Sequence, residues 1–316
     1  MKELYASLET SPEPPLPSEV KRLLVIHNPI AGRRRRHRYA AYLEALRAHG
    51  LLLEELPTTC RGDAERQARD IACGPGDMIV AAGGDGTINE VVNGLMHNRQ
   101  VGRDRPLAIL PLGTANVLAA EIGLRRDLDS IVDYITKGRP RRIALGRVGE
   151  RYFITMAGAG FDAHVVAAVD EMLKRRLGKL AYVTRLLQQL RTYDFPTYQA
   201  IIEGRNFPAS SIIVTNGRFY AGRLLLAPEA SLEEEALKVV LFQRKGVWHA
   251  LKYAAALLFG LLPRLSDVRQ LSAQRLRLEG PPGDPLQADG DLVGQLPANV
   301  ELVPAALPLL MPHAPR

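Results

Sequence analysis

From residue 21 onward, short apolar runs alternate with segments whose apolar residues recur every three or four positions. The runs predict buried strands, and the spaced pattern predicts amphipathic helices. The predicted strands cover 23–27, 51–56, 78–82 and 107–110, and the predicted helices 36–49, 63–72 and 128–137. Strands that alternate with helices form parallel sheets joined by right-handed crossovers. Residues 21–140 are therefore predicted to form an α/β domain with a parallel sheet.

The pattern changes after residue 137, and Arg139-Pro140 is interpreted as a domain boundary. Beyond it, many short β-leaning runs separated by turn residues predict a β-rich, sandwich-like second domain over 141–305. These runs lie at 143–148, 152–156, 199–202, 212–214, 239–242, 275–278 and 299–303, with helices expected at 163–173, 177–190 and 247–262. Residues 1–20 are expected to be a flexible leader. Residues 306–316 are expected to be a tail, with a return to the first domain left open.

Composition narrows the class of protein. The 316 residues carry a formal charge of +7, which suits an anionic partner, and only two cysteines. Two cysteines without Cys-x-x-Cys spacing argue against a disulfide framework and favour the cytoplasm. No signal peptide is expected, and the longest apolar stretch, 254–262, is far shorter than the roughly 20 residues of a spanning helix. A nucleic-acid partner is not expected, because no aromatic platform accompanies the basic residues.

The most informative stretch is Gly83-Gly84-Asp85-Gly86-Thr87, which follows the strand at 78–82. Ile88, Val91, Val92 and Leu95 continue it as one buried helix face. Thr87 and Glu90 have the spacing of a capping box, which predicts that the helix begins at Thr87. Glycines let backbone N–H groups approach a ligand, and a helix start favours anions. The stretch therefore predicts a phosphate site.

Two further polar loops end predicted strands of the same sheet. They are Asn28-Pro29-Ile30-Ala31-Gly32 and Pro111-Leu112-Gly113-Thr114-Ala115-Asn116. Ligands of such sheets bind at the carboxyl ends of the strands, so both loops are expected at the same site. Arg33–Arg36 and Arg38 follow the first loop and could bind phosphate, contact an acidic membrane surface or simply form a solvated basic helix start. Arg33, which is nearest the loop, is the candidate for phosphate.

The second domain offers two candidate motifs. Gly158–Ala163 matches the dinucleotide fingerprint, but the region where its acidic strand end should follow reads as helix, so a loop presenting Asp162 to a cleft is preferred. Asp289-Gly290-Asp291 places two carboxylates around a glycine, which suits a general base and a metal-binding partner. A solvated Asp-Gly turn is the alternative.

The segment 247–262 contains Trp248, Lys252, Tyr253 and Phe259. Contact with a bilayer is one interpretation of these residues. A core helix is the preferred one.

The order of these motifs is recognisable. Asn28-Pro29-x-x-Gly32, Gly83–Glu90, Pro111–Asn116, Gly158–Asp162 and Asp289–Asp291 together resemble the diacylglycerol kinase catalytic-domain family, and most of all its soluble bacterial lipid kinases. The resemblance covers about residues 21–305. It implies transfer of the γ-phosphoryl group of ATP, with Mg²⁺, to a lipid hydroxyl in a cleft between a nucleotide domain and a β-rich domain. It also implies phospholipid metabolism at the inner membrane surface.

The resemblance assigns roles to individual residues. Asp289 would be the base, Asp85 would face Mg²⁺ or the transferring phosphoryl group, Asp291 would contact the metal, and Asp162 would serve the lipid. The nucleotide-binding residues would be Asn28, Arg33, Gly83, Gly84, Gly86, Thr87, Gly113, Thr114 and Asn116.

Some positions depart from the family pattern. Asp291 replaces the usual Glu, Ala144 replaces an Asp, Glu234-Glu235 replaces Asp-Gly, and Lys238 replaces a later acid. Some bacterial members use acids in these areas for a structural Mg²⁺ network. We therefore expect this protein to lack that second metal.

Two other functions stay open at this point: a small-molecule kinase similar to NAD kinase, and a nucleotide-binding regulator without catalysis. The acceptor also stays open among diacylglycerol, phosphatidylglycerol, a sphingoid base and a polyprenol, as does a homodimer.

Overall fold

The computed structural model describes residues 20–29, 33–98, 105–168, 190 and 192–313, with the side chains of 33–35 left out. The chain forms two compact units. The first comprises Met1–Leu112, Ile122–Ile143 and Ala305–Arg316, and the second comprises Gly113–Glu121 and Ala144–Pro304. Only two strands, β5 (Arg139–Val148) and β18 (Ala298–Met311), run from one of these residue sets into the other among the described residues.

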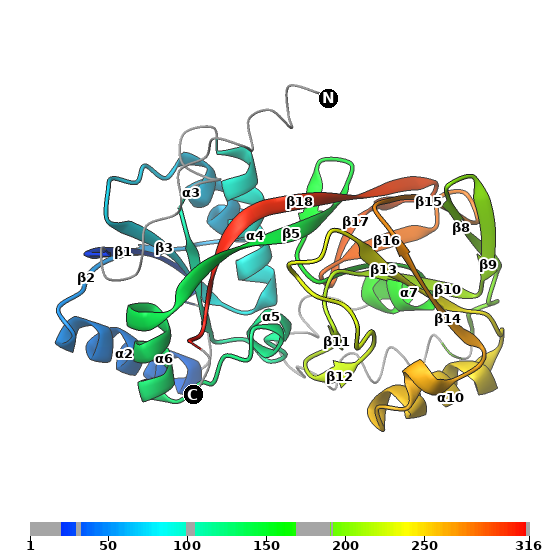
Figure 1. Ribbon diagram of the computed structural model, residues 1–316, viewed down its shortest axis with the longest axis horizontal. Coiled ribbons are helices and arrows are strands. Elements are labelled where there is room, and N and C mark those ends of the chain that lie inside the picture. Colours follow the sequence, from blue (N-terminus) through cyan, green and yellow to red (C-terminus); the bar gives the residue numbers. More distant parts are fainter. Residues whose placement is uncertain (1–19, 30–32, 99–104, 169–189, 191, 314–316) are drawn as a thin grey trace. The chain divides into compact units, whose positions relative to one another are not determined.

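The first unit is built on a parallel sheet in the order β2-β1-β3-β4 (Figure 1). Its strands are β1 (Arg22–His27), β2 (Leu52–Pro57), β3 (Asp77–Gly83) and β4 (Leu107–Pro111). Its helices are α2 (Arg33–Ala48), α3 (Asp63–Asp70), α4 (Asp85–His97) and α6 (Leu128–Lys137). Every residue of β3 and β4 is buried, as expected for central strands that are covered on both faces. The predicted α/β fold with a parallel sheet is confirmed.

The second unit is β-rich, as predicted. Strands β14-β13-β10-β7-β16-β17 form an antiparallel sheet, and β15, β8 and β9 belong to another together with β18. The strands are β6 (Arg151–Phe153), β7 (Met156–Gly160), β8 (Tyr198–Ile202), β9 (Arg205–Ala209), β10 (Ser211–Thr215), β11 (Phe219–Tyr220), β12 (Leu224–Leu225), β13 (Leu237–Phe242), β14 (Val268–Ala273), β15 (Arg275–Glu279), β16 (Pro285–Ala288) and β17 (Asp291–Gln295). Helices α5 (Val117–Glu121), α7 (Phe161–Ala168) and α10 (Val247–Leu258), and the short 3₁₀ helix η2 (Leu262–Arg264), accompany them.

The central sheet of this unit is apolar on both faces. In β10, Ile212 and Val214 enter a core cluster that also contains residues of β8 and β15, such as Tyr198 and Leu278. Ile213, between them, enters a different cluster with residues of β13, α10 and η2. Because successive side chains of a strand point to opposite faces, an uninterrupted apolar run such as 212–214 requires cover on both. Helix α10 supplies part of that cover.

Residues 113–121 belong to the second unit although the sequence places them between strands and helices of the first. The reason is Glu121, whose side chain is only 2% exposed. Its carboxylate accepts a hydrogen bond from the backbone N–H of Phe219 at 2.5 Å and one from Arg218 Nε at 3.4 Å. Its backbone oxygen accepts a third from Arg218 Nη2 at 2.9 Å. Although desolvation on burial raises the pKa of Glu121, these contacts attach the segment to the β10–β11 connection.

Several sequence-based boundaries differ from the structure. Arg139 and Pro140 lie inside β5, and the units divide between Ile143 and Ala144. The glycines 158–160, predicted in a loop, lie in β7. Strands β9, β16 and β17 were not predicted, because Pro208, Pro285 and the Asp-Gly pair read as turn residues. Strand β14 was also not predicted, since three of its six residues, Arg269, Gln270 and Ser272, are polar. The predicted helix 177–190 lies, apart from Leu190, outside the described residues.

The expectation of a core helix at 247–262 is confirmed for one face of α10 (Val247–Leu258), where Tyr253 and Ala256 are buried in a core cluster, and it is corrected in two ways. Helix α10 ends at Leu258, after which Gly260 adopts a positive φ of 68°. One face of it is not covered, since Trp248 is 82% exposed. None of the helices in the described ranges has both the length and the apolar character needed to cross a membrane.

Candidate phosphate loop, acidic turn and apolar cavity

The Gly83–Thr87 stretch forms the turn between β3 and α4. Gly83 ends the strand, Gly84 is the N-cap in an extended conformation, and α4 begins at Asp85. The predicted start at Thr87 is therefore wrong, and the N-cap residue, Gly84, has no side chain with which to cap the helix. Glu90 instead accepts a hydrogen bond from the backbone N–H of Gly62 at 3.1 Å. Asp85, Gly86 and Thr87 occupy the first turn, where backbone N–H groups have no partner within the helix and the helix dipole favours an anion.

Two glycines of this turn have different reasons to be glycine. A Cβ at Gly83 would lie 2.6 Å from both Cβ and Oγ1 of Thr87, so the close packing of strand and helix excludes a side chain there. A Cβ at Gly86 would meet nothing within 4 Å, and its φ is not positive. Neither packing nor backbone strain requires glycine at position 86. The glycine leaves open space against the start of the helix.

The other two loops differ in what they leave exposed. Asn28 follows β1 on the surface, and its backbone N–H donates to Ala82 O at 3.3 Å. Thr114 is also exposed. Asn116 is buried, and its amide both accepts from Gly113 N at 2.7 Å and donates to Gly113 O at 2.9 Å. Asn116 and Gly113 thus shape their loop by bonding to each other. The side chain of Arg33, the first residue of α2, lies outside the described part of the chain.

The Asp289-Gly290-Asp291 motif is the turn of the β16–β17 hairpin. Asp289 has a positive φ of 48°, and Asp291 is the first residue of β17. The two oxygens of Asp289 accept four hydrogen bonds from residues 154–156. The donors are the backbone N–H groups of Ile154 (2.7 Å), Thr155 (2.9 Å) and Met156 (3.0 Å), and the hydroxyl of Thr155 (2.6 Å). Three of these bonds end on Oδ1 and one on Oδ2, so Oδ1 in particular is committed to holding the turn in place.

Asp162 is joined to the same turn through one side chain. It lies in the first turn of α7, not in a loop as predicted, and accepts a hydrogen bond from the hydroxyl of Tyr220. Its other oxygen accepts from Gln287 Nε2 at 2.7 Å, and Gln287 Oε1 accepts from the backbone N–H of Gly290 at 3.0 Å. Desolvation by burial raises the pKa of Asp162. A Cβ at Gly158 would lie 2.7 Å from Asp162 Oδ2, which explains that glycine without a dinucleotide.

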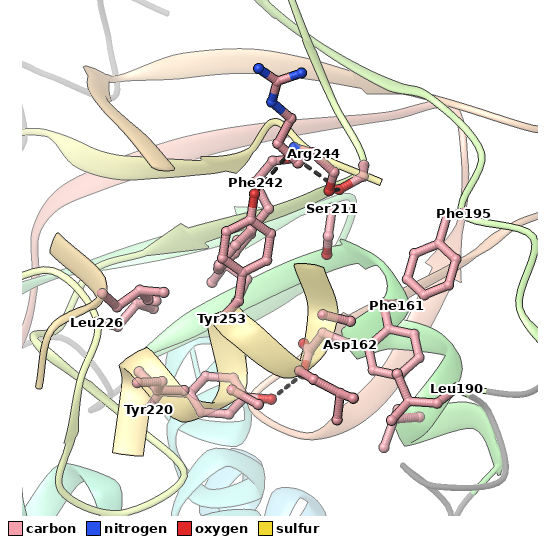
Figure 2. Close-up of a pocket in the computed structure, with 18 residues that line it drawn as sticks. Phe161, Asp162, Leu190, Phe195, Ser211, Tyr220, Leu226, Phe242, Arg244 and Tyr253 are labelled. Atoms are coloured by element: carbon pink, nitrogen blue, oxygen red, sulfur yellow. Dashed lines mark hydrogen bonds between the residues drawn. The ribbon is translucent and has the colours of Figure 1, made fainter. Parts of the chain in front are cut away.

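The far side of Asp162 faces a cavity of about 160 Å³ within the second unit. Figure 2 shows Asp162 and Tyr220 with the apolar side chains of the wall. The lining comes from α7, β10, β13 and α10 and includes Phe161, Val165, Leu190, Phe195, Ile213, Leu226, Phe242, Leu251, Tyr253 and Leu257. An apolar cavity with one acidic group in its wall suits a hydrocarbon chain that ends in a polar group.

Sequence reasoning did not find Tyr220 or Gln287. Neither residue stands in a motif, and each lies more than 50 positions from Asp162 (58 and 125). Only the pairing of β16 with β7 brings Gln287 opposite Gly158, beside Asp162.

Comparison with known proteins gives a consistent result for both halves of the chain. Residues 22–148 match the model of the diacylglycerol kinase catalytic domain. Residues 155–311 match that of the YegS C-terminal NAD kinase beta sandwich-like domain.

Individual relatives align along most of their length. The diacylglycerol kinase of Bacillus subtilis (strain 168) is 31% identical over 89% of this chain and 93% of its own. A Chromohalobacter salexigens protein named "Probable lipid kinase YegS-like" is 32% identical over 80% and 81%. A crystal structure of a diacylglycerol kinase from Bacillus anthracis str. Sterne superposes with a TM-score of 0.73 at 22% identity, covering 93% of this chain and 98% of that one, which shows a shared fold.

The residues around Lys238 do not fit a structural divalent ion. The Lys238 ammonium, in a residue only 9% exposed, lies 2.8 Å from Glu234 Oε1 and 3.2 Å from Ser272 Oγ. Ala144 offers no side-chain ligand, and its backbone N–H and oxygen bond to Leu232 and Asn216. Within the described ranges, no three His, Cys, Asp or Glu residues are grouped to hold a metal. The Lys238 ammonium thus supplies the positive charge beside Glu234 that a metal ion would otherwise supply.

We expect the melting temperature of the nucleotide-free protein to be the same, within about 1 °C, in EDTA and in millimolar Mg²⁺. An ion present at 100 times its dissociation constant would add about 2.7 kcal/mol of stability, which a thermal melt detects readily. Metal analysis of the dialysed protein should find far less than one divalent ion per chain. A tight stoichiometric ion, or a drop of several degrees in EDTA, would refute this expectation.

Proposed function

Because the chain belongs to the diacylglycerol kinase catalytic-domain family, we propose that it transfers the γ-phosphoryl group of ATP to the hydroxyl of a diacylglycerol-like lipid. The observation that carries the lipid half of this proposal is the hydrogen-bonded series Asp162–Gln287–Gly290. It connects the wall of an apolar cavity to the turn that bears Asp289 and Asp291. A lipid with its chain in the cavity would have its polar end on the side of these acids.

The nucleotide half of the proposal rests on the β3–α4 turn. The first-turn N–H groups of α4 and the space at Gly86 would receive the phosphates, with Gly83 and Gly84 setting the approach. Asn28, Arg33 and Thr114 would complete the nucleotide contacts, while Gly113 and Asn116 hold the shape of their loop.

A magnesium ion fits the acid in this turn. Asp85, at the first position of α4, is the oxygen ligand that Mg²⁺ prefers and would hold it. When bound, the ion supplies charge neutralisation on the phosphates. Positioning and charge neutralisation account for most of the catalysis of phosphoryl transfer, and a glycine-rich turn is suited to both.

The acid that accepts the hydroxyl proton needs a lone pair directed at the substrate. Asp289 was the expected base, but its four hydrogen bonds to residues 154–156 favour a positioning role. We therefore assign the base to Asp291, which follows two residues later and is partly exposed. Asp289 holds the turn that presents it.

We expect γ-labelled ATP to transfer its label into the organic phase when diacylglycerol is offered in mixed micelles. Phosphatidylglycerol, sphingosine, a polyprenol and NAD are offered in parallel, because the candidate lipid kinase and NAD kinase activities differ only in the acceptor that they phosphorylate. Label in NAD alone would contradict a lipid kinase. Nucleotide binding without transfer to any acceptor would indicate a regulator.

The two glycines of the β3–α4 turn provide a matched pair of variants. Gly86→Ala should keep or slightly raise the melting temperature, because alanine is favoured over glycine in a helix by up to about 1 kcal/mol and meets no neighbour. It should nevertheless weaken ATP binding at least about tenfold, equivalent to 1.4 kcal/mol. Gly83→Ala should lower stability by about 1–3 kcal/mol through its clash with Thr87. Calorimetric titration with ATP and thermal melts measure both effects. Unchanged ATP affinity of Gly86→Ala would contradict the proposal that the phosphates bind at this turn.

Variants of the two acids in the β16–β17 turn should likewise differ in whether they lose activity or stability. Asp291→Asn should reduce transfer about 10²–10⁴-fold, the usual contribution of a general base, and should change the melting temperature less than Asp289→Asn does. Asp289→Asn should lower the melting temperature, because its amide NH₂ would face backbone donors. If higher Mg²⁺ rescues Asp291→Asn, the residue binds the metal; if Asp291→Asn is fully active, it is not the base.

A further inference from the structure

Helix α10 has two apolar faces, and only one of them is explained by the fold. Tyr253 and Ala256 are buried in the core cluster beside β10 and β13, and the Tyr253 ring lies 5.0 Å from that of Phe242. Ala250, Leu251 and Leu257 line the cavity together with Tyr253, which Figure 2 labels. This inner face covers the second face of the central sheet.

The outer face of α10 is apolar as well. Trp248, Leu251, Ala255 and Leu258 follow one another at intervals of three and four, and all are exposed. Trp248 is 82% exposed and Leu258 66%, and Phe259, directly after the helix, is 78% exposed. The solvent face of a surface helix is ordinarily polar, so a continuous apolar stripe there marks an interaction site.

The charges around this stripe are mostly positive, and one acid, Asp267, pairs with one of the cations. Between Arg244 and Ser266 the chain carries Arg244, Lys245, Lys252 and Arg264, and no Asp or Glu. All four cations are exposed. The nearest acid along the chain, Asp267, accepts a hydrogen bond from Lys252 at 2.9 Å. Aromatic and aliphatic side chains rimmed by Lys and Arg are typical of helices that lie in the interface of an anionic bilayer.

We propose that the outer face of α10 docks on a bilayer surface that contains anionic lipids. A bilayer accounts for the cationic rim, which a purely apolar protein contact would not need. It also accounts for a connection to the cavity, because Leu251 both lines the cavity and is 39% exposed. Apolar surface therefore continues from the docking face into the cavity wall.

Docking here would let a hydrocarbon chain pass from the bilayer to the cavity along α10 with little exposure to water. This last step rests on the proposed lipid substrate. The docking itself does not, and it can be measured without any phosphoryl transfer.

Trp248 is the only tryptophan of the chain, so its fluorescence reports on this face alone. We expect vesicles of phosphatidylcholine with phosphatidylglycerol to shift its emission to the blue and to protect it from acrylamide. Vesicles of phosphatidylcholine alone should bind at least tenfold more weakly, and salt should weaken binding to the anionic vesicles. Sedimentation with the vesicles measures the partition directly.

The double variant Leu258→Ser/Phe259→Ser keeps the Trp248 probe and changes no residue that lines the cavity. Its partition onto anionic vesicles should fall at least tenfold. The matched control is Leu52→Ser, which removes a leucine of similar exposure (66%) from β2 and should leave the partition unchanged. A folded double variant is verified by its melting temperature.

Three results would overturn the docking proposal: vesicle binding without any change at Trp248, no vesicle binding, and a blue shift that grows with protein concentration in the absence of lipid. The last would indicate self-association through α10.

Activity separates this proposal from the proposed function. The double variant should phosphorylate a water-soluble short-chain diacylglycerol as well as wild type does and lose activity only on long-chain lipid in vesicles. Vesicle docking without phosphorylation of any lipid would contradict the proposed lipid kinase function and would still support the docking proposal.

Discussion

The need to cover both faces of one sheet governs the second unit. Because β10 and β13 carry apolar residues on successive positions, neither face can be left to water. One face packs against strands β8 and β15, and the other against α10 and η2. The cover on the second face is incomplete, and the space left between α7, the sheet and α10 is the apolar cavity. The lipid site proposed here is therefore a consequence of how that face is covered.

Polar contacts position the acidic side chains that lie beside this apolar cavity. Asp289 fixes its turn with four hydrogen bonds to residues 154–156, and Gln287 couples the turn to Asp162. Donors and acceptors that are satisfied in this way hold one geometry. In the first unit the corresponding device is the close packing of Gly83 on Thr87, which fixes the start of α4. The proposed nucleotide site and the proposed lipid site are thus each positioned by close contacts between strands, turns and helices.

Much of the fold follows from local patterns. The helix predicted over 128–137 occurs there, because Asp127 caps it and its apolar residues share one face. The parallel sheet follows from four apolar runs alternating with helices. The β16–β17 hairpin was missed, since Pro285 and Asp289-Gly290 favour turns and its strands are only four and five residues long. The capping box at Thr87 was also wrong, because Glu90 bonds to Gly62 on a neighbouring segment.

By itself the sequence determined that Gly83–Thr87 is a glycine-rich link between a strand and a helix, the kind of turn proposed here to bind phosphate, because such a link is a property of consecutive residues. It also identified the acids of the β16–β17 turn, but not their tasks. The hydrogen bonds that hold Asp289 come from residues 154–156, more than 130 positions earlier. The two faces of α10 are a similar case. Its composition favoured a core helix, and only the packing of the sheet decided which apolar face is buried and which, with Trp248, is left to a partner.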